Sequence, residues 1–111
     1  MIAEKADVAI EQAVAYELQN IVKNHGAVYA SKHEAYAVLL EEVEEAQEAL
    51  DGMRNNLETI WRQIRTNNTK SFDVYLCKES AIGLSEEAVQ CAAVCERFIE
   101  TIKKEEENGM A

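Results

Sequence analysis

The chain has 111 residues, of which 21 are acidic and 11 are basic, so its formal net charge is −10 at neutral pH. This length fits one domain with a modest hydrophobic core, and we expect residues 1–111 to form a single domain. A chain this acidic offers no basic stripe to neutralise phosphates, which argues against nucleic acid as a partner.

The first stretch with helical periodicity runs from about residue 4 to residue 23, where apolar residues recur at spacings of three, four and seven. Gly26 follows it and is suited to a helix C-terminal cap. The sequence contains no proline and only four glycines, which favours helices throughout. We therefore predict an all-α fold, an antiparallel helical bundle of three to four helices.

The second helix is predicted to begin at Ser31-Lys32-His33-Glu34, because the Ser31 hydroxyl and the Glu34 carboxylate have the spacing of a capping box. Its apolar stripe continues to Ile64, and the polar residues 66–69 then end it. Gly52 is a bend or a weak point within this long helix.

The third periodic region spans about residues 70–104 and completes a long central helical hairpin with the second helix. Residues 82–87 leave two alternatives open. They belong either to one bent helix or to a stop followed by a new helix with Ser85 as its N-terminal cap. The polar tail from about residue 104 is expected to fray.

Five glutamates fall between residues 39 and 50, and no lysine or arginine accompanies them. Charge runs of this kind are usually solvated helix faces. Glu41, Glu42 and Glu45, however, lie on adjoining parts of one face that is also partly apolar, so they cannot all turn fully into water. Grouped carboxylates without a competing ammonium group suit Mg²⁺ or Mn²⁺, and we interpret this segment as a metal site.

A bundle usually completes such a site with carboxylates from a facing helix. Glu87, with Gln90 three residues later on the same helical face, is the candidate. The alternative is that Glu86 and Glu87 only complement the partial positive charge at a helix N-terminus.

The segments SKHEAYAVLLEEVEEAQEAL and EEAVQCAAVCERFIE, in this order, resemble the MazG-like nucleoside triphosphate pyrophosphohydrolases, and in particular a small branch seen in bacterial and phage genomes. The pattern of that family is EExxE followed by ExxD. Residues 41–45 match its first half, while Glu87-Ala88-Val89-Gln90 matches the second with glutamine in place of aspartate. The resemblance covers about a third of the chain.

The resemblance implies a MazG-like fold and hydrolysis of a nucleoside triphosphate to the monophosphate and pyrophosphate. It also implies that Glu41, Glu42, Glu45 and Glu87 bind Mg²⁺ or orient water, with one of the first three as general base. Gln90 would offer only a neutral carbonyl oxygen to the metal, which lowers the charge of the site.

Two further functional classes remain open at this point. A non-catalytic helical bundle with a degenerate site would act as an interaction or regulatory protein. A carboxylate-bridged di-iron or di-manganese bundle is disfavoured because the sequence lacks a Glu-x-x-His pair.

Other residues that attract attention fit structural roles better. Cys91 and Cys95 are interpreted as small buried thiols rather than zinc ligands, because no second ligand pair accompanies them. His33 is expected on the surface and His25 at a helix end. Trp61 fits a core or an interface better than a nucleotide-stacking platform.

The expected setting follows from the same composition. No stretch approaches the roughly 18 to 20 apolar residues of a membrane span, and three cysteines fit a reducing compartment, so we expect a cytoplasmic protein with no membrane contact. Long helices in a short chain leave apolar surface uncovered, which predicts a homo-oligomer. The family resemblance implies a dimer or a tetramer.

Overall fold

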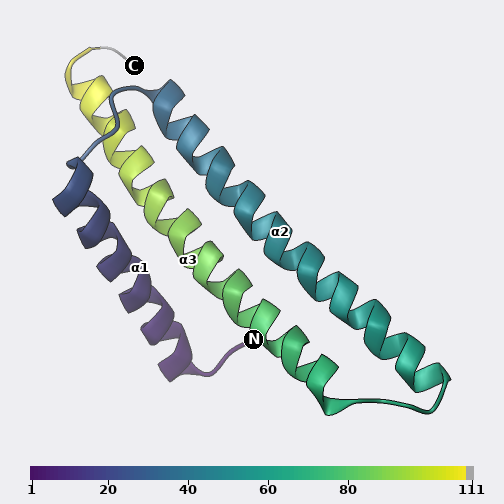
Figure 1. The fold of residues 1–111 in the computed structure, drawn as a ribbon. Coiled ribbons are helices and arrows are strands. Elements are labelled where there is room, and N and C mark those ends of the chain that lie inside the picture. Colours follow the sequence, from purple (N-terminus) through teal and green to yellow (C-terminus); the bar gives the residue numbers. More distant parts are fainter. Residues whose placement is uncertain (110–111) are drawn as a thin grey trace. The chain divides into compact units, whose positions relative to one another are not determined.

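The computed structural model describes residues 1–109, which form three helices, α1 (Glu4–His25), α2 (Lys32–Arg65) and α3 (Ser71–Glu107) (Figure 1). No strand occurs within these residues, so the prediction of an all-helical bundle is confirmed. The chain divides into two compact units. Unit 1 comprises residues 1–42 and those from Val89 onward, and unit 2 comprises residues 43–88. None of the three described helices has the length and apolar character needed to cross a membrane.

The ends of α1 and α2 follow the capping signals in the sequence. Gly26 caps α1 with φ of 91°, and its N–H donates to the Val22 carbonyl at 2.8 Å. At the start of α2 the Glu34 N–H donates to Ser31 Oγ at 3.1 Å. The Glu34 carboxylate accepts from the Ala30 N–H at 3.5 Å, one residue earlier than in the standard capping box. Local hydrogen bonds thus set both boundaries.

The third helix is continuous, which decides between the two alternatives for residues 82–87. α3 passes through Gly83 without a break, because a single glycine costs a helix only about 1 kcal/mol. Ser85 is not an N-terminal cap, since its hydroxyl donates back to the Ile82 carbonyl at 2.6 Å. The helix continues to Glu107, so the tail expected from about residue 104 is helical in its first residues. Residues 110 and 111 lie outside the described part.

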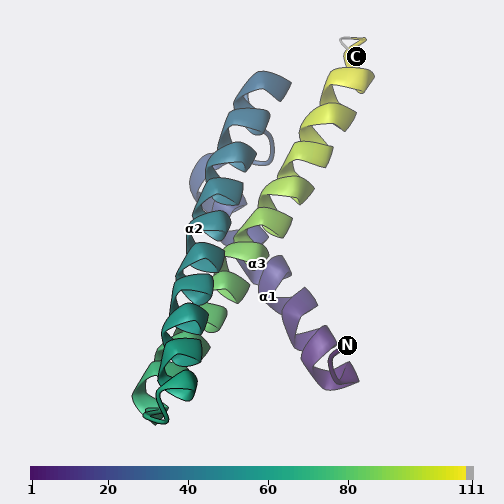
Figure 2. The same ribbon diagram turned by 90° about the vertical axis from the view of Figure 1, so that its right-hand side faces the viewer.

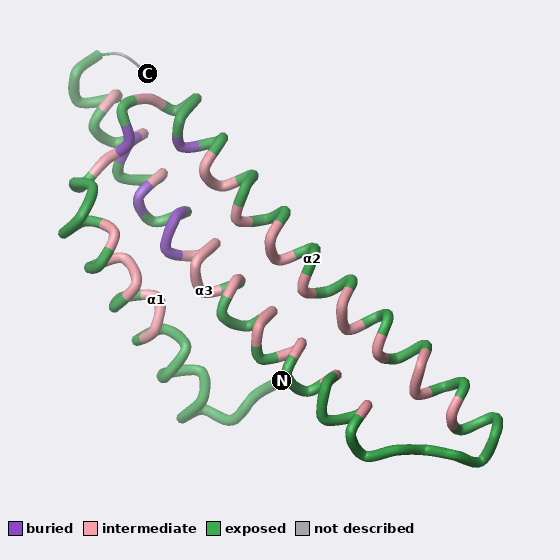
Figure 3. Tube along the Cα trace, in the orientation of Figure 1, coloured by how far each residue is buried: buried purple, intermediate pink, exposed green. Residues whose placement is uncertain are grey.

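Unit 1 contains a small core formed by the α1–α2 connection, the first turns of α2 and the C-terminal half of α3. Its centre is formed by Tyr29, Ala35 and Val94, each at most 4% exposed, with three half-buried side chains packed around them, namely Val38, Leu39 and Phe98. Figure 3 shows these buried positions in the α1–α2 connection, at the start of α2 and along α3. Figure 2 shows that α1 runs obliquely to the unit 1 part of α3.

Unit 2 is a hairpin of two antiparallel helical segments, residues 43–65 of α2 and 71–88 of α3 (Figure 1). The Gln63 side chain holds its turn, because Nε2 donates to Asp73 Oδ2 at 2.7 Å and Oε1 accepts from the Lys70 N–H at 3.1 Å. Along the hairpin, Ser80 Oγ donates to Asn56 Oδ1 at 3.0 Å. Unlike unit 1, unit 2 contains no fully buried residue.

Candidate functional site

Two of the predicted acidic residues come together in unit 2. Glu45 on α2 and Glu87 on α3 are both half-buried, and their carboxylate oxygens lie within 4.8 Å of each other. The side-chain hydrogen bond with Glu87, followed by burial and by the negative charge of Glu87, raises the pKa of Glu45 above its ordinary value of 4.5. Two carboxylates from facing helices that are this close prefer either a shared proton or a cation.

The other glutamates of the motif differ in exposure. Glu42 precedes Glu45 by one turn of α2 and is half-buried, and its ligand oxygen lies within 4.8 Å of that of Glu45. Glu42 and Glu87 each take part in further polar interactions. Glu41, by contrast, is exposed. The structure therefore brings Glu45 close to both Glu42 and Glu87, while Glu41 lies on the solvent side of the same helix.

The donor set agrees with the chemistry of a hard divalent cation. All the grouped ligand atoms are carboxylate oxygens, which Mg²⁺ and Mn²⁺ prefer, and no thiol or imidazole belongs to the group. The residues present would accordingly fit Mg²⁺ better than Zn²⁺.

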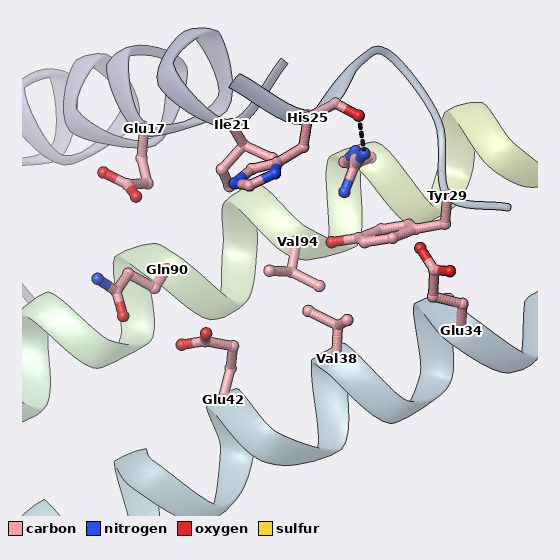
Figure 4. Close-up of a pocket in the computed structure, with 10 residues that line it drawn as sticks. Glu17, Ile21, His25, Tyr29, Glu34, Val38, Glu42, Gln90 and Val94 are labelled. Atoms are coloured by element: carbon pink, nitrogen blue, oxygen red, sulfur yellow. Dashed lines mark hydrogen bonds between the residues drawn. The ribbon is translucent and has the colours of Figure 1, made fainter. Parts of the chain in front are cut away.

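Unit 1 contains a pocket of about 500 Å³ between its three helical segments (Figure 4). Its lining combines the apolar side chains of Ile21, Val38 and Val94 with polar ones, including Glu42 and Gln90. Figure 4 shows the Glu42 carboxylate and the Gln90 side chain, from α2 and α3, pointing toward each other at one end of this pocket. Gln90 also takes part in a polar interaction of its own. The pocket thus contains both an apolar wall and groups able to hydrogen-bond a ligand.

Arg97 is the residue that the sequence analysis missed. It is 6% exposed, and its guanidinium group donates to three carbonyl oxygens at the end of α1 and just beyond, those of His25 (2.8 Å), Gly26 (3.1 Å) and Val28 (3.1 Å). The same group lies 4.0 Å from the centre of the Tyr29 ring. A basic residue within the apolar stripe of α3 was the available signal, because a buried cation needs partners.

Thr101, one turn after Arg97, completes this anchor. Its hydroxyl accepts from the Tyr29 N–H at 2.9 Å and donates to the Arg97 carbonyl at 2.9 Å. The connection between α1 and α2 is therefore fixed to α3 at one wall of the pocket, to which Tyr29 and Arg97 both contribute.

The remaining predictions have mixed outcomes. His33 is exposed and His25 ends α1, as expected. The prediction of buried thiols is wrong for Cys95, which is exposed, and Cys91 is half-buried. Trp61 is 57% exposed and therefore is not a core residue, and the Arg65 guanidinium lies 5.9 Å from its ring centre.

A comparison with known protein-family models gives no match, and neither do searches among curated proteins and solved structures.

Proposed function

We propose that this protein is a Mg²⁺-dependent nucleoside triphosphate pyrophosphohydrolase that converts an NTP or dNTP to the monophosphate and pyrophosphate. The observation that supports this proposal most is the pairing of Glu45 with Glu87, because two facing helices bring carboxylates within hydrogen-bonding reach. Such a pair is unfavourable when both groups are ionised, and a divalent cation would relieve the repulsion. The resemblance of the two motifs to the MazG-like family gives the reaction.

In this proposal Glu42, Glu45 and Glu87 would hold the metal ion. When bound, Mg²⁺ would neutralise charge on the phosphate oxygens and lower the pKa of an attacking water. The exposed Glu41 would orient that water or act as general base. Another glutamate of the motif could take this role instead if it does not bind the metal. Gln90 would contribute a neutral amide at the position where the family has an aspartate.

The pocket of unit 1 supports binding of a nucleoside. Its apolar wall of Ile21, Val38 and Val94 would pack against a base or sugar, while the Gln90 amide would donate and accept hydrogen bonds. Glu42 also lines this pocket, so its carboxylate would lie beside a nucleoside bound there. Nucleoside triphosphates are cytoplasmic substrates, which fits the cytoplasmic location that the cysteine content of the sequence predicts.

The test is thermal unfolding in chelator, in Mg²⁺ and in Mn²⁺, each with a panel of nucleoside triphosphates and monophosphates, followed by an assay for released pyrophosphate. A ligand at 100 times its dissociation constant stabilises the folded state by about 2.7 kcal/mol. We expect a metal-dependent shift with particular nucleotides. Glu87→Gln should abolish the shift and the turnover, whereas the matched variant of its exposed neighbour, Glu86→Gln, should retain both.

One alternative is favoured by a specific observation. Gln90 provides no negative charge to a centre that in the MazG-like family contains an aspartate, so the site would be degenerate and the bundle would act as an interaction or regulatory protein. The absence of a thermal shift and of pyrophosphate release with every metal and nucleotide would support this alternative. Restored activity in Gln90→Asp would then identify the missing charge as the cause.

A further inference from the structure

Unit 2 lacks a core of its own. Every residue from 43 to 88 is described, and none is buried. A hairpin of two helices buries only one narrow strip of side chains between them. The remaining apolar side chains are therefore exposed unless another surface covers them. Ten large apolar side chains of unit 2 are exposed, namely Val43, Leu50, Leu57, Trp61, Ile64, Phe72, Val74, Tyr75, Leu76 and Ile82.

The exposed residues on α2 form a regular pattern. Val43, Leu50, Leu57 and Ile64 are spaced seven residues apart over three heptads, and Trp61 lies between the last two. We call these five residues the α2 seam. A seven-residue apolar repeat on one helix face is the pattern by which two helices pack as a coiled coil. Its members are between 38% and 62% exposed, so the helices of this chain leave the seam accessible.

The area of the seam is close to what a stable pair requires. Large aromatic side chains present roughly 150 to 250 Å² and aliphatic ones somewhat less, so half-exposed members of this set offer on the order of 500 Å² together. Two copies would bury roughly 1,000 Å² of apolar surface, before the flanking polar residues are counted. Specific interfaces begin at about 1,000 to 1,200 Å² in total.

The charges beside the seam indicate its partner and its direction. Residues 44–51 carry four acidic groups and no base, whereas residues 53–65 carry three arginines and one glutamate. In an antiparallel pair of identical helices, the acidic half of each copy lies beside the basic half of the other. A parallel pair would instead align acid with acid. Two copies in antiparallel orientation are therefore complementary in both apolar pattern and charge.

We propose that the α2 seam is a dimer interface, in which residues 43–65 of two copies of this chain pack antiparallel about a two-fold axis between Met53 and Arg54. Val43 of one copy would then lie near Ile64 of the second copy. Glu44 and Arg65, which directly follow these two residues, would form ion pairs across the interface. This interface does not depend on the proposed hydrolase activity, since it involves a different face of the chain.

The first experiment measures molar mass by sedimentation equilibrium between about 1 and 100 µM protein. We expect the wild-type chain to have twice the chain mass, and Leu57→Glu to raise the dissociation constant on the order of 100-fold, because it places a charge in the seam of both copies. Tyr16→Glu makes the same change at an exposed aromatic residue of α1, 72% exposed and outside the seam, and should remain dimeric. A monomeric wild-type chain at 100 µM would overturn the proposal.

A second experiment tests the antiparallel orientation of the two α2 helices in the dimer. It uses substitutions at exposed positions, which should leave the fold of each chain unchanged. Arg65→Glu and Glu44→Arg should each weaken the dimer about 10-fold, and the double variant should restore it, because the charges are exchanged across the interface. Helix content from circular dichroism serves as the folding control. If the double variant weakens the dimer by as much as the two single substitutions together, the antiparallel pairing is wrong.

Discussion

Arg97 offers the sharpest test of how unit 1 is held together. The guanidinium group donates three hydrogen bonds to carbonyls at and beyond the C-terminus of α1, where the helix dipole is negative and no further helical N–H can reach them. Replacing Arg97 by methionine keeps much of the side-chain volume but removes all three bonds. It also leaves the carbonyls of His25, Gly26 and Val28 without these donors.

The expected cost follows from the number and type of these bonds. A hydrogen bond to a charged group contributes about 1.5 to 3 kcal/mol to the free energy of unfolding. The contributions of the three bonds do not add fully, and removal of one partner of a buried ionic interaction costs about 3 to 5 kcal/mol in total. We expect Arg97→Met to lower the free energy of unfolding by about 4 kcal/mol, which is a large part of the 5 to 15 kcal/mol typical of a domain. The corresponding fall in Tm is roughly 20 °C.

The measurement is urea and thermal denaturation followed by circular dichroism at one fixed protein concentration. Arg97→Lys should lose about 2 kcal/mol, because an ammonium group cannot reproduce the planar fork of the guanidinium. Arg62→Met, at an exposed position of α2, should change stability by no more than about 0.5 kcal/mol. A loss below about 1 kcal/mol for Arg97→Met would refute the view that this residue anchors the end of α1.

Two other predictions concern unit 2. A Cβ at Gly52 would lie 3.7 Å from Ser80 Oγ, an ordinary contact, so Gly52→Ala should raise the free energy of unfolding by about 0.5 to 1 kcal/mol in urea denaturation, as should Gly83→Ala, where no atom lies within 4 Å. Destabilisation by Gly52→Ala would mean that the two helices approach more closely than described. The pKa of Glu45 is raised in the folded state, chiefly by the hydrogen bond with Glu87. This hydrogen bond therefore contributes to the free energy of unfolding below the unfolded-state pKa of Glu45, and the contribution is lost as the pH rises through the folded-state pKa. Glu45→Gln, which can still donate to Glu87, should therefore have a higher Tm than the wild-type chain at pH 7 in chelator. This difference should shrink toward pH 4, and a difference that does not change with pH would contradict the shared hydrogen bond.

The ends of α1 and the start of α2 could be predicted, because the signals for them are local. The Ser31 hydroxyl bonds a backbone N–H three residues later, and Gly26 needs only its own backbone freedom to end α1. The spacing of glutamates on α2 is local as well, so the grouping of Glu42 with Glu45 could be predicted. The continuity of α3 could not, since Gly83 and Ser85 are compatible with either a break or a helix.

Which distant residues meet, and which apolar residues remain exposed, depends on the tertiary structure. The bonds from Arg97 to residues around 70 positions earlier depend on how α3 packs against the end of α1, and no local pattern encodes that contact. The same holds for the pairing of Glu45 with Glu87, which depends on the register of the hairpin. Periodicity also marks an apolar stripe without showing whether the chain covers it. The exposure of Trp61 and Leu57 became visible only once both helices of unit 2 were in place.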